Sequence, residues 1–347
     1  MTSKKPTSDN PYFCILAWIH LYVTPSSEVF PCCFGATDQP VGNLLQDDLT
    51  GIMNGEGMKA LRRRMLSGRK SHHCRRCYKA EALGFRTMRQ NSNAKFERHL
   101  EQCDLTGEDG HLDDVALRYL DVRFSNICNL KCRFCWHECS SSWYEDYKFL
   151  NPGYDKTRIM KAGRSDDHLW GQIVDQLSTV DDIYFAGGEP LLMQEHYRIL
   201  QHLDGAERYE VELSYTTNLS TLSYKTLDVT DLWRKFRSVA VGVSLDGLGS
   251  RGEYIRKGLD WQQFIINLET VRECCPHVDL SANLTINILN IFDLISIYNH
   301  LESHDVFQGI RLEINFLDQP EAYSVQVLPR HVKAELSAEF LDYAENA

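Results

Sequence analysis

The sequence predicts an α/β fold with a parallel sheet, curved or barrel-like, preceded by a smaller α+β module. Two observations predict it. From residue 116 onward, apolar runs typical of strands alternate with stretches whose apolar residues recur at helical spacing. Before residue 106, the chain instead carries a hairpin pattern and several cysteines.

The predicted strands of the larger part cover residues 117–124, 182–186, 211–216, 238–244, 279–286 and 310–316. Between them, Trp170, Ile173 and Leu177 follow a helical period, and so do Trp261, Phe264 and Leu268. We therefore expect a module over 1–105, a polar linker over 106–115, the α/β domain over 116–317 and a C-terminal segment with a helix over 318–347.

Composition restricts the class of protein. The formal net charge of −11 argues against a general nucleic-acid binder, since contacts to phosphates need an excess of Lys and Arg. The polar start Met1–Asn10 has no apolar core of a signal peptide, and polar residues interrupt the apolar stretch Leu284–Tyr298. We expect a cytoplasmic protein without a membrane or nucleic-acid partner, whose twelve cysteines serve metal or redox chemistry.

The first third contains a cysteine constellation. Residues 13–23 and 29–30 predict a hairpin with Cys14 on its first strand and Cys32 and Cys33 after its second, and residues 47–66 predict two helical pieces. Cys74 and Cys77 then show the Cys-x2-Cys spacing of metal ligands. Cys14, Cys32, Cys74 and Cys77 are enough to close a metal site, with Cys33 as a spare ligand; a structural zinc and free buried cysteines are the alternatives.

A basic run extends from Arg62 to Arg76 within this acidic chain. Such a run is typical of a solvated face. The alternative is that it offsets the negative charge of a nearby cluster held by thiolates.

Cys128, Cys132 and Cys135 follow the first predicted strand of the α/β domain at spacing Cys-x3-Cys-x2-Cys. Three thiolates at this spacing can ligate three irons of a cubane cluster and leave the fourth iron open for chemistry. Cys139 follows three residues later, so a closed four-thiolate site of a non-catalytic iron-sulfur or zinc protein is the rival hypothesis.

Unusual residues also follow the next three strands, at the face where such folds place active sites. Gly187 and Gly188 remove side chains so that a ligand can approach the backbone, although a Gly-Gly-Glu-Pro sequence alone is also typical of an ordinary turn. Asn218 and Ser244 offer short polar groups, or serve as caps, and Arg256 can pair with a carboxylate.

Taken together, the three cysteines, Gly187-Gly-Glu-Pro190 and Ser244-Leu-Asp-Gly247 resemble the radical S-adenosylmethionine (radical SAM) superfamily over about residues 116–317. The resemblance implies a partial (β/α)6 TIM-like barrel and a [4Fe-4S] cluster on the three cysteines, whose open iron binds S-adenosylmethionine. It also implies where that cosubstrate lies: Gly187, Gly188 and Glu189 at its amino group, Ser244 and Arg256 at its carboxylate, and Asn218 near its ribose.

The first third resembles the SPASM or twitch module, which holds auxiliary iron-sulfur clusters in many of these enzymes. Cys14, Pro31-Cys32, Gly42-Asn43 and Cys74 to Cys77 match its pattern. The module usually follows the barrel and here precedes it, with enough cysteines for one auxiliary [4Fe-4S] cluster.

By this resemblance, a reductant such as flavodoxin or ferredoxin supplies one electron, and a 5′-deoxyadenosyl radical removes hydrogen from the substrate. We expect a small molecule, such as a sugar or an aminoglycoside, because no leader-binding segment is evident before the auxiliary module; a peptide is the alternative. Oxidation assisted by the auxiliary cluster and epimerisation using a thiol both stay open, and no catalytic side chain is assigned.

Overall fold

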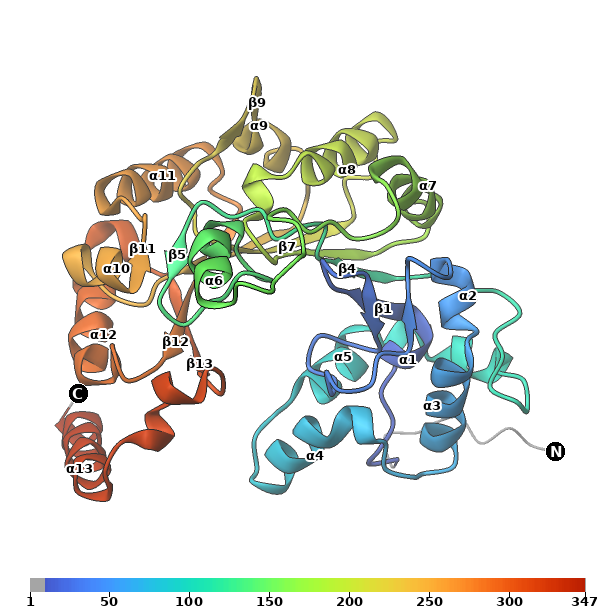
Figure 1. Ribbon diagram of the computed structural model, residues 1–347, viewed down its shortest axis with the longest axis horizontal. Coiled ribbons are helices and arrows are strands. Elements are labelled where there is room, and N and C mark those ends of the chain that lie inside the picture. The colour runs from blue at the N-terminus through green and yellow to red at the C-terminus, as the bar shows by residue number, and fades with distance from the viewer. Residues whose placement is uncertain (1–9, 347) are drawn as a thin grey trace. The chain divides into compact units, whose positions relative to one another are not determined.

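The computed structural model describes residues 10–346, and contacts within the chain gather it into two units (Figure 1). Unit 1 comprises the residues up to Ser125 together with Met160–Phe185. Unit 2 comprises Asn126–Ile159 together with the residues from Ala186 onward. This division follows contacts between residues and does not test the predicted domain boundaries. The linker over 106–115 and the boundary at 317 therefore remain predictions.

Unit 1 contains strands in the order β3 (Gly42–Asn43), β2 (Glu28–Phe30), β1 (His20–Val23), β4 (Tyr119–Val122) and β6 (Asp182–Phe185). β1 and β2 form the expected antiparallel hairpin, in which Tyr22 lies opposite Phe30. On its other side β1 pairs in parallel with β4, and β4 pairs in parallel with β6. The hairpin of the cysteine module therefore shares one sheet with two strands predicted for the α/β domain.

The prediction of a strand over 13–23 is wrong in its first half, because Leu16–Ile19 form the short helix α1 and only His20–Val23 are extended. All four residues of α1 are buried, and a buried apolar run carries no period that separates strand from helix. Cys14 accordingly lies before a helix and not on a strand. The other helices of unit 1 are α2 (Leu49–Met53), α3 (Glu56–Leu66), η1 (His72–Cys74), α4 (Arg75–Ala82), α5 (Met88–Lys95), η2 (Glu97–Leu105) and α7 (Asp166–Gln176).

In unit 2, β7 (Glu212–Thr217), β10 (Val239–Ser244), β12 (Asp279–Ile286) and β13 (Arg311–Phe316) pair in parallel in this order. Strands at all six predicted positions and helices between them confirm the α/β class. Two short ribbons add β5 (Lys131–Cys132) paired with β11 (Arg256–Lys257), and β8 (Ser223–Tyr224) paired with β9 (Leu227–Asp228).

The helices of unit 2 follow the sequence pattern. In α11 (Trp261–Cys274), Phe264, Leu268 and Val271 are buried, and the Asp260 carboxylate caps the helix by accepting a hydrogen bond from the Gln263 backbone. The remaining helices are η3 (Ser141–Trp143), α6 (Tyr144–Leu150), η4 (Pro190–Leu192), α8 (Gln194–Gly205), α9 (Val229–Trp233), α10 (Gly249–Ile255), η5 (Ile291–Asp293), α12 (Leu294–Ser303), η6 (Asp305–Phe307), η7 (Glu321–Tyr323), η8 (Val325–Val327) and α13 (Arg330–Asn346).

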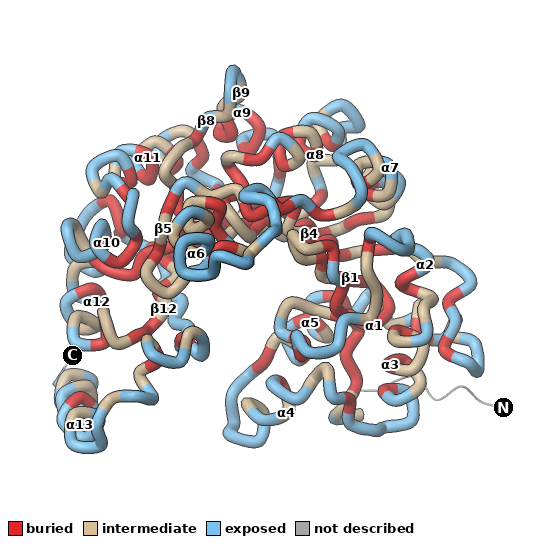
Figure 2. The backbone as a smooth tube through the Cα atoms, viewed as in Figure 1, coloured by how far each residue is buried: buried red, intermediate tan, exposed pale blue. Residues whose placement is uncertain are grey.

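Burial differs between elements (Figure 2). β4 and β10 are almost wholly buried, whereas α4 buries only Cys77 and α13 buries only Leu336. Within residues 10–346, no helix has both the length and the apolar character that crossing a bilayer requires.

Arg62, on α3, is fully buried and holds three parts of unit 1 together. Its guanidinium donates hydrogen bonds to the backbone carbonyls of Met53 at 2.6 Å, Gly110 at 2.7 Å and Ala17 at 3.1 Å. Burial lowers the pKa of Arg62 to about 10, so the side chain stays charged at neutral pH. This residue of the basic run therefore belongs to the core and not to a solvated face.

Replacing Arg62 by Ala removes the donor for three buried carbonyls. We expect the free energy of unfolding to fall by about 3 kcal/mol or more, measured by urea denaturation. Arg63→Ala is the matched control, because the Arg63 side chain is 37% exposed and pairs with the exposed Glu56; its cost should stay below about 1 kcal/mol. Equal costs for the two variants would contradict the structural role of Arg62.

Candidate functional site

A cavity of about 210 Å³ in unit 2 collects the residues singled out in the sequence of the α/β domain. Its walls come from the cysteine loop after Asn126, from the turn after β6, and from the ends of β7 and β10. It is lined by Cys128, Cys132, Cys135, Cys139, Gly187, Gly188, Glu189, Thr216, Thr217, Asn218, Ser244 and Arg256, among others. The three predicted cluster cysteines and the six predicted cosubstrate residues thus share one cavity, while their individual roles remain predictions.

The cysteine loop is held by side-chain hydrogen bonds to its backbone and by one short strand, β5. The carbonyl of Cys128 accepts a hydrogen bond from the Ser142 hydroxyl at 2.8 Å, and the carbonyl of Cys132 accepts one from the Trp143 indole at 3.1 Å. Cys132 also lies opposite Arg256 in the β5–β11 ribbon. These bonds fix where the thiols point, which spacing alone cannot do.

Two N–H donors lie beside the thiols. The Asn218 side-chain amide lies 3.9 Å from the sulfur of Cys128, and the Arg256 guanidinium lies 3.7 Å from the sulfur of Cys132. Burial raises the pKa of Cys128 to about 12 and raises that of Cys132 too, the latter against the pull of Arg256. The thiols are therefore protonated until a metal displaces their protons, and donors of this kind then stabilise the bound thiolates.

Glu189 is almost fully buried and connects three segments of the site. Its carboxylate accepts hydrogen bonds from the Thr217 hydroxyl and the Asn218 backbone, both at 2.7 Å, and its own backbone N–H donates to the Ile127 carbonyl at 2.7 Å. Burial raises the pKa of Glu189, and these hydrogen bonds oppose the rise. Glu189 therefore fixes the cysteine loop and the end of β7 relative to the glycine turn.

The glycine turn before Glu189 needs glycine for a conformational reason. Gly187 and Gly188 have φ angles of +80° and +57°, a region that other residues rarely adopt. The absence of two side chains also leaves this wall of the cavity as bare backbone.

Asp246 is a site residue that the sequence reasoning did not single out, although it lies within the quoted Ser244-Leu-Asp-Gly247. Its carboxylate is fully buried and lies 2.5 Å from the Arg256 guanidinium. Burial raises the pKa of Asp246, whereas Arg256 lowers it. Nη2 of Arg256 is paired with Asp246, while Nη1 of the same guanidinium is directed at the sulfur of Cys132 in the cavity. The available signal was a charged residue two positions after a predicted strand, at the end where such folds place their sites.

Cys139 lines the same cavity as the three predicted ligands. Its thiol is hydrogen-bonded to that of Cys135, which is the first cause of the raised pKa of Cys135, ahead of burial. The donor set therefore fits an iron-sulfur cluster, with Cys139 as the residue that separates a three-thiolate from a four-thiolate site. Among residues 10–346, no three His, Cys, Asp or Glu side chains are already arranged as ligands of a metal ion.

A second group of thiols lies in unit 1. Burial raises the pKa of Cys14, and the nearby thiols of Cys74 and Cys77 raise it further. Burial also raises the pKa of Cys32, and the nearby thiols that raise it further are those of Cys33, Cys14 and Cys74. Cys14, Cys32, Cys74 and Cys77 thus come together although they are far apart along the chain. That these four thiols together hold a cluster remains a prediction, and four thiols are a donor set that suits one.

Hydrogen bonds hold the segments of this second group. The carbonyl of Phe13 accepts from Arg89 at 2.7 Å and from Asn93 at 3.0 Å, which fixes the chain before Cys14. The backbone N–H of Ala36 donates to the carbonyl of His73 at 3.1 Å and ties the loop after Cys32 to the turn before Cys74.

Cys33 lies close both to the thiol of Cys32 and to a carboxylate. Its thiol donates a hydrogen bond to the buried carboxylate of Asp121, and burial, followed by the charge of Asp121, raises the pKa of Cys33 to about 12. Asp121 in turn lies 2.8 Å from Arg123, whose guanidinium stacks between the rings of Tyr22 and Tyr184. The predicted spare ligand therefore has a partner of its own on β4.

Two segments of the chain match known protein families. Residues 122–292 match the radical SAM superfamily, and residues 14–78 match the iron-sulfur cluster-binding SPASM domain. The order of these segments agrees with the prediction that the cluster-binding module precedes the α/β domain. A comparison with curated protein sequences gives no match.

Three solved structures similar to this chain are longer than it. A histidine-tagged form of anSMEcpe with bound AdoMet is 18% identical, with a TM-score of 0.42 over 58% of this chain and 50% of that chain. Native anSMEcpe with bound AdoMet and the Cp18Cys peptide is 16% identical, with a TM-score of 0.39 over 56% and 49%. Streptococcus suis SuiB bound to precursor peptide SuiA is 14% identical, with a TM-score of 0.44 over 84% and 63%. The chain thus spans about half the length of anSMEcpe.

The ligand count of the cavity in unit 2 can be tested with two variants. After anaerobic reconstitution with iron and sulfide, Cys132→Ala should lose the iron of one cluster. Cys139→Ala should retain it, because three thiolates suffice for a cluster with an open iron. Iron content and visible absorption measure both. Equal loss in the two variants would instead establish a closed four-thiolate site.

The second group of thiols allows an equally direct comparison. Cys74→Ala should lower the iron content by about one cluster and leave the cluster in unit 2 intact, since its thiol belongs to the gathered four. Cys33→Ala is the matched control and should keep its iron, because its thiol contacts Asp121 instead. Iron loss in Cys33→Ala, with iron retained in Cys74→Ala, would reverse the assignment of these ligands.

Proposed function

Because this chain belongs to the radical SAM superfamily and carries a SPASM-type module, we propose that it reductively cleaves S-adenosylmethionine and abstracts hydrogen from a peptide, which it oxidises. The observation that carries the proposal is the common cavity of Cys128, Cys132 and Cys135 with the glycine turn, Ser244 and Arg256. A [4Fe-4S] cluster with bound S-adenosylmethionine supplies the sulfonium cleavage and the 5′-deoxyadenosyl radical.

In this proposal the protein binds and orients. Cys128, Cys132 and Cys135 hold the cluster, while Asn218 and Arg256 donate N–H groups toward it. The bare backbone at Gly187 and Gly188 admits the amino group of the cosubstrate, and Ser244 and Arg256 face its carboxylate. Asp246 keeps Arg256 in place, since an unpaired buried guanidinium would be costly.

A peptide is the substrate class that unit 2 favours. β13 is the outer strand of its sheet, and among the described residues no strand pairs with its free edge. Five of its six residues are exposed, including Ile314 and Phe316 at 46% and 67%. An edge with free backbone groups and apolar side chains can bind an extended peptide as an additional strand. The sequence analysis favoured a small-molecule substrate and kept a peptide as the alternative. We now propose the peptide.

Oxidation is the reaction class that the second group of thiols supports. Removing a hydrogen atom leaves one unpaired electron on the substrate, and forming a neutral closed-shell product then releases that electron to an acceptor and a proton to solvent. A cluster on Cys14, Cys32, Cys74 and Cys77 is the acceptor that this chain can hold. A protein reductant such as flavodoxin or ferredoxin delivers the electron that starts the reaction.

The proposal is tested by measuring 5′-deoxyadenosine. Reconstituted protein with dithionite and S-adenosylmethionine should form it slowly, and Cys132→Ala should form none. A fractionated peptide pool should raise the rate by about tenfold or more if it completes the site, whereas a pool of sugars and aminoglycosides should not. No product at all would refute the enzyme hypothesis, and stimulation by the small molecules alone would refute the peptide.

A further inference from the structure

Unit 1 carries a strongly basic segment beside the second group of thiols. Residues 57–80, the basic segment, contain nine Lys and Arg residues and no Asp or Glu, in a chain whose formal net charge is −11. The segment covers most of α3, all of η1 and the first turns of α4, and it includes Cys74 and Cys77. Positive charge is therefore concentrated where the auxiliary ligands lie.

Part of this charge is already used inside unit 1. Arg62 is buried, the Lys59 ammonium lies 2.7 Å from Asp109, and Arg75 lies 3.3 Å from Asp38. Arg63 is half-buried and lies 2.6 Å from Glu56. The other five basic side chains are exposed. Within residues 10–346, no carboxylate pairs with the following exposed side chains: Arg64, Arg69, Lys70, Arg76 and Lys79. Their charge is available to a partner.

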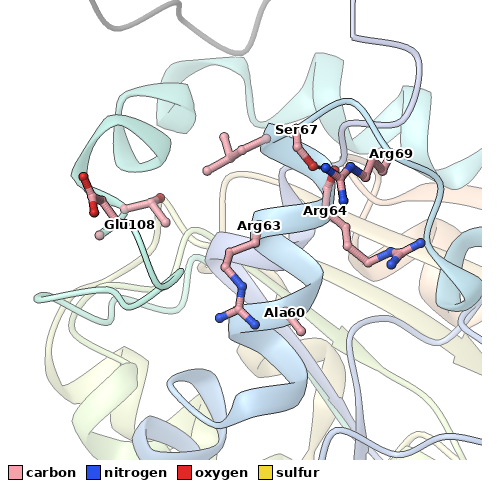
Figure 3. Close-up of a pocket in the computed structure, with 9 residues that line it drawn as sticks. Ala60, Arg63, Arg64, Ser67, Arg69 and Glu108 are labelled. Atoms are coloured by element: carbon pink, nitrogen blue, oxygen red, sulfur yellow. Dashed lines mark hydrogen bonds between the residues drawn. The ribbon is translucent and has the colours of Figure 1, made fainter. Parts of the chain in front are cut away.

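The exposed charges border a hollow in the surface. A cavity of about 710 Å³ is lined by Arg63, Arg64 and Arg69 on the side of α3, and by Glu108 on the facing loop (Figure 3). Because Arg63 is paired with Glu56, the available charges are those of Arg64 and Arg69 against the single carboxylate of Glu108, and they leave the hollow positive. Acidic side chains of a partner can enter it and pair with arginine.

A short series of contacts connects this surface to the auxiliary thiols. The Lys70 ammonium lies 5.7 Å from the ring centre of Tyr12, and the rings of Tyr12 and Tyr78 are 5.3 Å apart. Tyr78 lies on α4 one helical turn after Cys74, the residue at the N-cap of this helix. A protein bound over Lys70 would thus be two aromatic rings from a cluster ligand, and electron transfer between proteins depends on such closeness.

We propose that the basic segment is the docking surface for an acidic one-electron carrier protein of the flavodoxin class, which exchanges electrons with the auxiliary cluster. The proposal rests on the proposed function, since it needs a cluster on these thiols. Each exchange moves one electron: the reduced carrier loses it and the oxidised cluster gains it, or the reverse. No bond forms or breaks. A compact acidic protein touches only this face, whereas an extended nucleic acid would also meet the acidic remainder of the chain.

The test is the rate at which reduced flavodoxin reduces the reconstituted protein, followed by stopped-flow absorption at several salt concentrations. For the unmodified protein the rate should fall as salt rises. The double variant R69E/K70E should be reduced about tenfold or more slowly at low salt and should lose most of the salt dependence. The matched control R330E/K333E makes the same charge change on exposed positions of α13 and should behave like the unmodified protein.

Dithionite separates this proposal from the proposed function. The variant R69E/K70E should keep its iron content and its 5′-deoxyadenosine formation with dithionite, because neither side chain is a ligand or lines the cavity in unit 2. A flavodoxin rate equal to that of the unmodified protein, or a matching loss in R330E/K333E, would overturn the docking surface. The docking surface would also be overturned if R69E/K70E bound the peptide substrate or an oligonucleotide more weakly while its electron transfer with flavodoxin was unchanged. Failure of cleavage with dithionite in the unmodified protein would instead refute the enzyme hypothesis.

Discussion

The site in unit 2 depends on the hydrogen bonds made by one buried carboxylate. Glu189 accepts from Thr217 and from the backbone of Asn218, and its own N–H donates to the carbonyl just before Cys128. The cysteine loop, the glycine turn and the end of β7 are thereby held in one arrangement. A buried carboxylate is stable only when it is fully hydrogen-bonded, so the same bonds that position the segments also offset the cost of burying it.

The two groups of cysteines reach similar donor sets by different means. Cys128, Cys132 and Cys135 lie on one loop, so spacing brings the thiols close and side-chain hydrogen bonds to the backbone orient them. Cys14, Cys32, Cys74 and Cys77 come from separate segments that the hydrogen bonds of Arg89, Asn93 and Ala36 hold together. The first group can form with its loop, whereas the second depends on the folding of unit 1 as a whole.

The basic side chains near the two groups of cysteines differ in whether they are paired with a carboxylate. Next to the cavity of unit 2, Arg256 is paired with Asp246, so its charge is directed and largely compensated. On the surface of unit 1, several basic side chains of residues 57–80 have no carboxylate partner among the described residues and face solvent. A buried charge must be paired, and it then orients a ligand; an exposed charge can remain available to a partner. The basic run of the sequence thus divides into a core residue, Arg62, and an exposed face.

Local patterns in the amino-acid sequence were enough to predict the α/β class, the six strand positions and the residues near each group of thiols, because apolar period and ligand spacing are local properties. They could not predict that Leu16–Ile19 form a helix, because a fully buried run has no distinguishing period. The pairing of β1 with β4, the ion pair of Asp246 with Arg256 and the closeness of Cys33 to Asp121 are evident only in the folded chain. Each of these depends on residues distant in the chain, whose approach no local pattern encodes.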